Sequence, residues 1–439
     1  MPERRVVITG LGVVSPAGIG MDALWDGLLA RRSFTRKITA FDASEFPTDL
    51  GGSVEDFSAR KFVPKSYRKS VKIMARDIEL AVGAADLAFR DAGIVTASAG
   101  ADAELTIESS RIGCNIGAGL ICSDLDEMGV ALASSLDDEG KFSLAKWGEG
   151  GMSNLTPLWL LKYLPNMLAC HVTIVHGAKG PSNTITCGDA SAHLAIGEAT
   201  RLVERGGADA AIAGGAECKL NPMGLLRQSK LNRLCTTWQG DASEACRPFD
   251  AQHAGTVIGE GGGLLVIEAM DSAKARDGRM YAEVVGFASA CDPCGIDVLE
   301  PTAGGLGQAV RAAMRDAGIG PEQVGLIVTH GTGVAGEDVC ETVEWKSVFG
   351  DHVERIPAVA VSGSLGSLFA GAGGVELAVA AKALHSQTVP PTVNFTSPAP
   401  DCGLNLSSEA RSGDFEYAVS AAFSVGGQSG ACVLRRIEP

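Results

Sequence analysis

The residues best suited to chemistry in this sequence lie in one short segment, from Gly180 to Ala199. A β-rich run ends at Thr186, the turn Cys187-Gly188-Asp189 follows, and a helix-forming stretch begins within one residue. A strand that turns sharply into a helix directs a side chain toward the free N–H groups of the helix start, where the macrodipole favours negative charge. The segment therefore predicts a site for a nucleophile or an oxyanion.

This segment resembles the active-site segment of the β-ketoacyl-ACP synthases, the condensing enzymes of fatty-acid and polyketide synthesis. In that family it has the form Gly-Pro-x-x-x-Ile-x-Thr-Ala-Cys, followed by a helix that ends Ile-Gly-x-Ala. Gly180-Pro181 and residues 196–199 match without gaps, so the family's nucleophilic cysteine falls on Asp189. A cysteine, Cys187, stands two residues earlier. Two interpretations stay open: the nucleophile is lost, or the turn is rearranged around Cys187.

Two further motifs of the family carry its histidines. His330 matches the first histidine, in a His-Gly-Thr-Gly motif with Asp338 and Glu341 at the family's acidic positions. The second motif, Lys-Ser-x-x-Gly-His in the family, corresponds here to Ser-Gly-Ser-Leu-Gly-Ser. Ser362 then stands at the lysine position and Ser367 at the position of the second histidine.

A fourth motif, Ala-Phe-Ser-Val-Gly-Gly from residue 422, is close to the family's gating loop Phe-Gly-Phe-Gly-Gly. The resemblance implies that Phe423 gates an acyl pocket, that Gly426 belongs to the gating loop, and that the backbone N–H groups of residues 423 and 189 form the oxyanion hole. The frame of the site is therefore kept, whereas three of its four reacting side chains differ.

Asp189 is a poor replacement for a thiol nucleophile, because carboxylate attack on a thioester gives a mixed anhydride that is more reactive than the thioester. At a helix N-terminus Asp189 is expected to stay ionised, held by backbone N–H groups as an N-cap. There it would fill the oxyanion hole and repel an enolate. In the gap-free alignment Cys187 is a structural thiol, and the nearby Asp189 is expected to raise its pKa.

The chain contains a hidden duplication. A predicted helix at 77–92, capped by Gly93, leads into a buried strand at 111–116, and a similar helix at 309–319 leads into a strand at 324–328. Such a repeat predicts two related α/β halves. The resemblance implies the thiolase-like fold, an α/β architecture with five layers in the order helix, sheet, helix, sheet, helix.

Domain boundaries follow from the same resemblance. The first half is expected to span residues 1–252 and the second residues 253–439, because the glycine-rich run at 259–263 resembles family segments that join the halves. Residues 130–172 have a weak periodic pattern. In the family this region is an insertion that builds much of the dimer interface and the acyl tunnel.

Composition restricts the partners. The net charge of −15 argues against non-specific binding to nucleic acid or to an anionic membrane, and no run of about eighteen apolar residues is present for a membrane span. Twelve scattered cysteines fit a reduced, cytoplasmic protein. The lone Cys291-x-x-Cys294 pair has no second pair and no nearby histidine, so no metal site and no cofactor are expected.

The most positive segment of the chain lies where the family docks its acidic acyl carrier protein. Its core is Lys65, Arg68 and Lys69, with Lys61 and Lys72 beside them, and Lys230 and Arg233 are candidates to extend it. The alternative interpretation is a solvated helix face without a partner.

The leading hypothesis is a ketosynthase-like subunit that lacks the Cys-His-His set and serves as partner to an active ketosynthase. It resembles the chain-length-factor subunits of type II polyketide systems, although those usually carry glutamine at the nucleophile position. A dimer is expected, either of two copies or with an active ketosynthase. The alternatives are an active condensing enzyme, acyltransferase or decarboxylase that uses Cys187 or Asp189 with His330, and a binding scaffold without chemistry.

Overall fold

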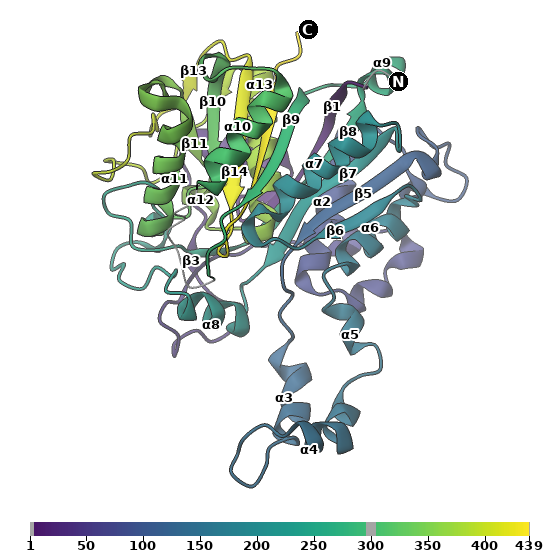
Figure 1. Cartoon of the computed structure of the whole chain (residues 1–439). Coiled ribbons are helices and arrows are strands. Elements are labelled where there is room, and N and C mark those ends of the chain that lie inside the picture. Colours follow the sequence, from purple (N-terminus) through teal and green to yellow (C-terminus); the bar gives the residue numbers. More distant parts are fainter. Residues whose placement is uncertain (1–3, 296–303, 439) are drawn as a thin grey trace.

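The computed structural model describes residues 4–295 and 304–438, and the described chain forms two halves of one design (Figure 1). The strands follow one path, β11-β10-β14-β15-β9-β1-β8-β7-β5-β6, which a short antiparallel pairing of β1 with β9 joins at its middle. The path divides there into a first sheet, β1-β8-β7-β5-β6, and a second sheet, β9-β15-β14-β10-β11. Strands that correspond in chain order take corresponding places, which confirms the predicted duplication. The strands are β1 (Val6–Ser15), β5 (Ile112–Ala118), β6 (Ser182–Ile185), β7 (Ala210–Cys218), β8 (Ile258–Ala269), β9 (Ala282–Cys291), β10 (Val324–Thr329), β11 (Ala358–Ala360), β14 (Tyr417–Phe423) and β15 (Gln428–Arg435).

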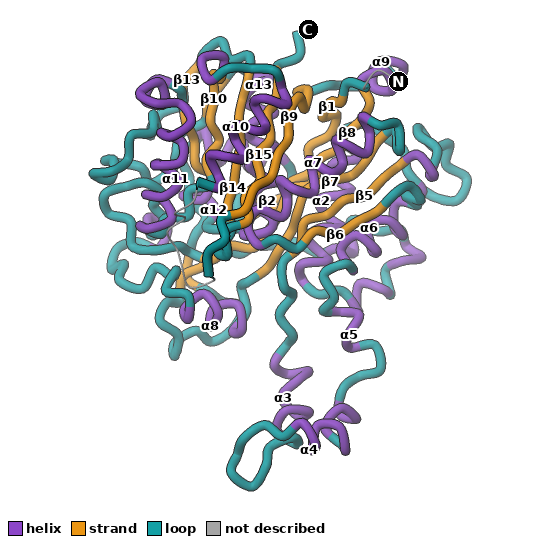
Figure 2. Tube along the Cα trace, in the orientation of Figure 1, coloured by secondary structure: helices purple, strands orange, loops and turns teal. Residues whose placement is uncertain are grey.

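Helices separate and cover the two sheets, as the tube in Figure 2 also shows. Two helices, α7 and α13, lie between the sheets, α2 and α6 cover the outer face of the first sheet, and α10 covers the second with α11 beside it. These five layers are the thiolase-like fold. The bounds are α2 (Arg76–Asp91), α6 (Met167–His176), α7 (Ser191–Glu204), α10 (Gly305–Ala317), α11 (Ala335–Phe349) and α13 (Ala372–Ser386).

Strand β8 corrects the expected boundary between residues 252 and 253. It pairs antiparallel with both β1 and β7, so it belongs to the first sheet, and the second half begins at β9. Its glycines suggested a junction, but they serve close packing within the strand. A Cβ atom on Gly263 would lie 2.4 Å from the backbone of Gly374, so only glycine lets α13 pack directly on this strand.

Residues 120–166 form an arm that projects from the body of the molecule (Figure 1). It carries α3 (Leu125–Ala133), α4 (Leu144–Glu149) and α5 (Trp159–Lys162). The remaining short elements are α1 (Met21–Leu29), α8 (Pro222–Lys230), α9 (Met270–Ala275), α12 (Ser362–Leu365), β2 (Gly18–Ile19), β3 (Arg36–Lys37), β4 (Leu50–Gly52), β12 (Thr388–Val389) and β13 (Arg411–Ser412). In the described part of the chain, no helix has the length and apolar character needed to cross a membrane.

Candidate active site

The turn between β6 and α7 has the geometry that the sequence predicts. A short 3-10 turn, Gly188–Ala190, joins the strand to the helix, and Gly188 has a φ of 54°, in the left-handed region that glycine adopts without strain. The Ser191 hydroxyl accepts the N–H of Cys187 at 2.8 Å and donates to the carbonyl of Gly188 at 2.6 Å. These bonds lock the turn, and Asp189 lies buried within it.

Asp189 does not cap the helix, contrary to expectation. Helix α7 has no side-chain N-cap bond, and the carboxylate instead accepts a hydrogen bond from the Arg233 guanidinium at 2.9 Å. The N–H of Ala190 points to the Ser424 hydroxyl at 3.0 Å. The expected filling of the oxyanion hole by Asp189 is therefore also wrong, because a buried arginine outcompetes the backbone for this carboxylate.

Arg233 is the centre of a buried chain of charges, which we call the ion-pair chain: Glu337, Arg233, Asp189, His330 and Glu376. The guanidinium lies 2.7 Å from a Glu337 oxygen and 2.9 Å from Asp189. His330 Nε2 lies 3.5 Å from the same Asp189 oxygen, and His330 Nδ1 lies 3.0 Å from Glu376. Each of the five residues is at most 5% exposed. Charges of opposite sign thus alternate along the chain, as buried charges require.

The pKa values follow from this alternation. Burial alone would favour the neutral acid, but the charge of Arg233 and the hydrogen bond with His330 hold the pKa of Asp189 well below its usual range. Burial opposes protonation of His330, yet Glu376 and Asp189 raise its pKa well above the ordinary value. Burial raises the pKa of Glu376 to about 7, against the opposing charge of His330. At neutral pH the site therefore holds an aspartate, an arginine and an imidazolium.

His330 follows β10, and two acidic residues fix its loop. Glu341 accepts the backbone N–H groups of His330 and Gly331, at 2.9 and 2.8 Å. Asp338 accepts those of Thr332, Gly333 and Phe249, and burial raises the pKa of Asp338 to about 8. Both acids thus hold backbone, away from the reacting face of the imidazole.

The loop of the second motif lies beside His330 but presents no imidazole or ammonium group. Ser367 forms a short bridge with β8, its N–H bonding to Val257 and its carbonyl accepting from Gly259 at 2.7 Å. The Ser362 hydroxyl donates to the carbonyl of Gly331. Both serines, with His330 and Glu376, line a cavity of about 10 Å³, which is about the space that one water molecule needs.

The gating-loop residues also lie at the site. Phe423, at the end of β14, is buried and meets the His330 ring edge to face, with centroids 6.2 Å apart. Gly426 is in the following turn with a φ of 99°. Between them, Ser424 donates its hydroxyl to the carbonyl of Cys187, which ties the gating loop to the β6–α7 turn.

Cys187 is partly buried, and no described residue lowers the pKa of its thiol. Burial, and then the neighbouring Cys291, raise the pKa of the thiol above its ordinary value. The expected direction is therefore observed, but Asp189 is not its cause. A thiol with a raised pKa is a weak nucleophile, because the thiolate is the reactive form.

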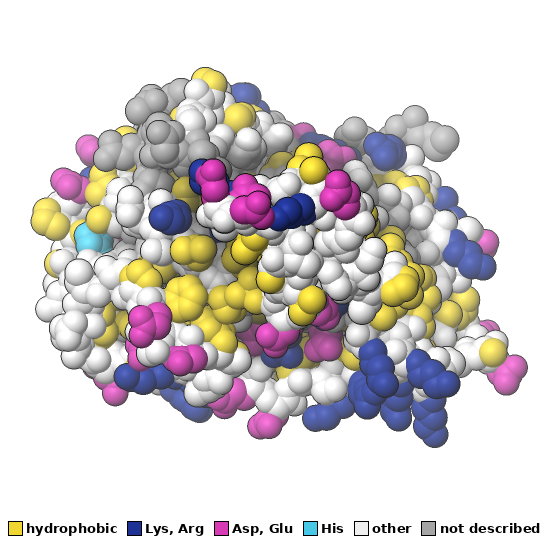
Figure 3. Space-filling view, turned by 90° about the horizontal axis from the view of Figure 1, so that it is seen from below, with side chains coloured by type: hydrophobic (Ala, Val, Ile, Leu, Met, Phe, Trp, Pro, Cys, Tyr) yellow, Lys and Arg dark blue, Asp and Glu magenta, His cyan; other side chains and the backbone are white. Residues whose placement is uncertain are grey.

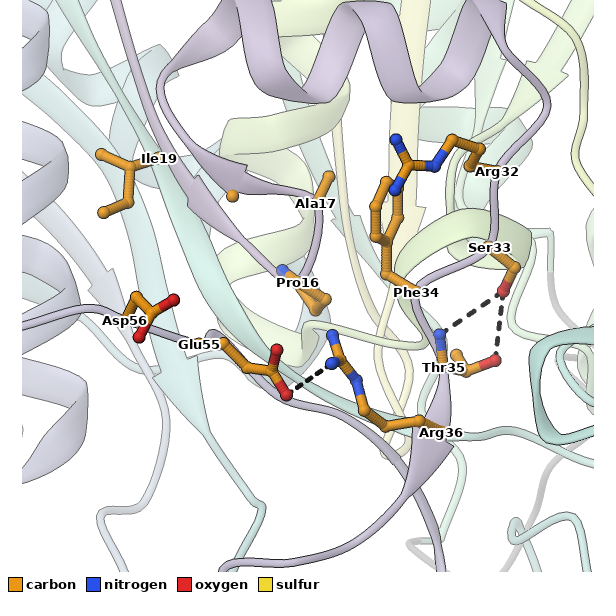
Figure 4. A pocket seen from close by; sticks show the side chains of 11 residues that line it. Pro16, Ala17, Ile19, Arg32, Ser33, Phe34, Thr35, Arg36, Glu55 and Asp56 are labelled. Carbon is orange, nitrogen blue, oxygen red and sulfur yellow. Dashed lines mark hydrogen bonds and ion pairs between the residues drawn. The ribbon is translucent and has the colours of Figure 1, made fainter.

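A separate pocket of about 600 Å³ lies between residues 16–19, 32–36 and 55–56 (Figure 4). The Arg32 guanidinium lies 5.0 Å above the Phe34 ring, and Arg36 forms an ion pair with Glu55 across the pocket. Phe34 and Arg32 bond through their backbones to Ser364, behind the second motif. None of the predicted site residues lines this pocket, so it is separate from the ion-pair chain.

The proposed docking residues differ in their exposure to solvent. Lys65, Arg68 and Lys69 are exposed on two short 3-10 turns and their connection, and Lys230 is exposed at the end of α8. Arg233 is only 3% exposed, so it cannot extend a docking surface. The sequence predicts an exposed Arg233 because it follows Lys230 by three residues and the local pattern does not indicate burial.

Sequence reasoning also missed the roles of Glu337, which pairs with Arg233, and of Glu376, which pairs with His330. Glu337 lies one residue before Asp338, and Glu376 lies on the inner helix α13 among apolar neighbours. His193, on α7, adds a buried imidazole 2.9 Å from the Ser420 hydroxyl, and burial lowers its pKa to about 3. A buried Glu in an apolar helix was the one available signal, because such a group needs a charged partner.

The two stacked α/β halves, with their strand-to-helix turns meeting at a histidine, define the class of thiolase-like condensing-enzyme folds. The chain matches the family models described as "Beta-ketoacyl synthase, N-terminal domain" over residues 3–273 and "Beta-ketoacyl synthase, C-terminal domain" over residues 281–396. The protein therefore belongs to the β-ketoacyl synthase family. The division between the two matches agrees with the position of β8 in the first half.

Similar proteins cover the whole chain. A 3-oxoacyl-[acyl-carrier-protein] synthase 2 of Synechocystis sp. is 34% identical over 439 residues, which is 100% of this chain and 99% of that protein. Among solved structures, "The ishigamide ketosynthase/chain length factor" has a TM-score of 0.84 at 27% identity, covering 99% of this chain and 100% of that one. A type II polyketide synthase acyl-carrier protein in complex with its ketosynthase bound to the hexaketide has the same TM-score and coverage at 25% identity.

Proposed function

We propose that this protein is a ketosynthase-like subunit of fatty-acid or polyketide synthesis that does not condense substrates itself and acts as chain-length-factor-like partner of an active ketosynthase. The observation that carries the proposal is the ion pair between Arg233 and Asp189 at the nucleophile position. Asp189 is held as a carboxylate. If a carboxylate accepted the acyl group, the product would be a mixed anhydride, which is more reactive than a thioester and does not hold the acyl group stably.

The remaining site supports the same proposal. Condensation needs donors that stabilise the enolate formed from the malonyl group. Here His330 is bound on one side by Glu376 and on the other by Asp189, and Ser367 and Ser362 supply no imidazole or ammonium group. The cavity beside them has room for about one water molecule, which is too little for a malonyl group.

The arm supports a role in assembly. It exposes ten large apolar side chains, and clustered exposed apolar groups are typical of interaction surfaces: Leu120, Leu125, Val130, Leu136, Phe142, Leu144, Met152, Leu158, Leu160 and Leu161. Figure 3, which views the molecule from the side of the arm, shows apolar side chains with both acidic and basic ones between them. Strand β6 is also the edge of its sheet, next to the active-site turn, and can pair with a strand of another subunit.

An acyl carrier protein is the second partner in this proposal. Lys65, Arg68 and Lys69 are exposed, and none of them forms an ion pair with any described residue. An unneutralised basic cluster on a chain with a net charge of −15 is a suitable contact for an acidic carrier. The similar ketosynthase that was solved in complex with its acyl-carrier protein is consistent with such a contact.

The test is a condensation assay with acyl-ACP and malonyl-ACP, run with this protein alone and with an active ketosynthase added. The expected result is no β-ketoacyl product from this protein alone, and product of changed chain length when it is added to the ketosynthase. Condensation by this protein alone at rates typical of its relatives would overturn the proposal.

The second candidate is an active β-ketoacyl-ACP synthase, which the full-length match to a 3-oxoacyl-[acyl-carrier-protein] synthase 2 favours. It requires Cys187 to carry the acyl group. Incubation with acyl-ACP followed by mass spectrometry separates the candidates, because a stoichiometric acyl adduct on Cys187 is expected only for the enzyme.

A further inference from the structure

The Arg233 guanidinium is held in place by residues other than Asp189. Its Nε lies 2.7 Å from one oxygen of Glu337, and its Nη2 donates to the other Glu337 oxygen at 2.9 Å. Its Nη1 donates to the Gln228 side chain at 3.2 Å, and its Cζ lies 5.6 Å from the centroid of the buried Phe369 ring. The cation is therefore positioned for a carboxylate by contacts that do not involve Asp189.

His330 is held in the same way. Glu376 binds its Nδ1 at 3.0 Å, and Glu341 accepts its backbone N–H at 2.9 Å, so that Nε2 is the ring atom that meets Asp189. Two cations that other residues fix thus converge on one atom, Oδ2 of Asp189, at 2.9 Å from the guanidinium and 3.5 Å from the imidazole. A guanidinium and an imidazolium directed at one oxygen form a binding site for a carboxylate anion.

The Asp189 carboxylate has no comparable support from its own segment. Helix α7 has no side-chain N-cap bond, and the hydrogen bonds that close the turn are made by the hydroxyl groups of Ser191 and Ser424. Among the residues that the structure describes, the partners of this carboxylate are Arg233 and His330. The side chain therefore occupies the place that a bound anion would have, and the turn is closed without it.

We propose that Asp189 is an internal ligand, an autoinhibitory contact in which its carboxylate fills a site that Arg233 and His330 form for the carboxylate of a small acid. The inference rests on the proposed function and adds a reason for the missing chemistry. The free end of a malonyl group is a carboxylate, which would have to displace Asp189 before it could meet either cation. A tethered group resists displacement, because its effective concentration beside the cations exceeds that of a free ligand.

The test uses the full chain with Asp189→Ala, which removes the carboxylate and leaves its space. Formate is the probe, because it is the removed group with a hydrogen in place of the methylene carbon. Urea denaturation is compared in sodium formate and in sodium chloride of equal ionic strength. Formate at about ten times its dissociation constant is expected to raise the folded-to-unfolded ratio of this variant about elevenfold. It should also raise the titration midpoint of the His330 imidazole in NMR spectra, and the wild type should show neither effect.

Two controls accompany this variant. Asp189→Asn should not respond to formate, because the amide still fills the site, and Asp189→Ala with Arg233→Met should lose the response together with the guanidinium. If Asp189→Ala is unfolded in chloride, its refolding in formate becomes the readout.

No response or refolding of Asp189→Ala in formate, an equal effect of chloride, or an equal response of either control would each overturn the inference. A formate response of Asp189→Ala together with condensation by the wild-type chain alone would overturn the proposed function and leave the carboxylate site standing.

Discussion

The centre of the molecule and its arm use the same acidic side chains in opposite ways. In the ion-pair chain, every charge is buried and has a partner of opposite sign within 3.5 Å. In the arm, Asp126 and Glu149 are exposed and have no partner among the described residues of their own chain. Burial makes the difference, since a buried charge is costly unless it is paired whereas an exposed one is solvated by water.

The buried charges of the ion-pair chain belong to the interior of the fold, whereas the exposed charges of the arm are available to a partner. A paired buried charge is held by its partner inside the folded chain. An unpaired exposed charge contributes little to folding and is available for recognition. The predictions below test this contrast, from the largest expected effect to the smallest.

The largest effect concerns the chemistry of the centre. Asp189→Cys restores a thiol under the start of α7, but carbon–carbon bond formation is expected to stay near background. Each missing donor costs about 10²- to 10³-fold in rate, and two positions, Ser367 and Ser362, lack the family's groups. The readout is β-ketoacyl product from acyl-ACP and malonyl-ACP.

The control for that variant is the triple change Asp189→Cys, Ser367→His and Ser362→Lys, which should recover some decarboxylation of malonyl-ACP. If Asp189→Cys alone condensed substrates at rates typical of ketosynthases, the missing donors would have to come from elsewhere in the chain, and the placement of Ser367 and Ser362 in the second motif would be wrong.

The second effect is on stability. Arg233→Met leaves Asp189 and Glu337 buried without their cation, and removing one partner of a buried ion pair typically costs about 3–5 kcal/mol. Urea denaturation should show this loss in the free energy of unfolding. Lys230→Met, three residues away and exposed, is the matched control and should change it by less than about 0.5 kcal/mol. Equal stability of the two variants would mean that Arg233 is not the cation of the ion-pair chain.

The third effect is on protonation. Because its pKa is raised, His330 stabilises the fold fully below about pH 6.5, the ordinary value, and this contribution is lost as the pH rises through its higher folded value. Asp189 has a lowered pKa, so its contribution is present above its ordinary value and is lost only at acid pH. Stability should therefore decline on both sides of neutrality. Asp189→Asn should lower the titration midpoint of His330 in NMR spectra of the imidazole nitrogens.

Asp351→Asn, an exposed change beside α11, is the control for this titration and should leave the His330 midpoint unchanged. An unchanged midpoint in Asp189→Asn as well would show that Asp189 does not act on the imidazole. The 3.5 Å separation would then be a contact without electrostatic consequence.

The sequence predicted the parts of the molecule that depend on local pattern. The duplicated strand and helix order, the tight turn at Gly188 and the acidic residues that hold the His330 loop all follow from spacing and from the family resemblance. The partner of Asp189 did not, because Arg233 lies 44 residues later and only the folded chain brings it to the turn. The glycines of β8 suggested a boundary because glycine in a strand and glycine in a linker have the same local signature.

The smallest effect is expected on the arm. Asp126→Lys with Glu149→Lys removes two exposed carboxylates that no described residue binds, so the free energy of unfolding should change by less than about 0.5 kcal/mol. The measurement is urea denaturation at a protein concentration low enough to keep the chain monomeric, so that any change in association does not enter. The contrast with Arg233→Met is then direct, because both variants alter charge and only one alters a buried pair. A loss as large as that of Arg233→Met would mean that these carboxylates are part of the internal structure of the arm, and they could then not be the groups that face a partner.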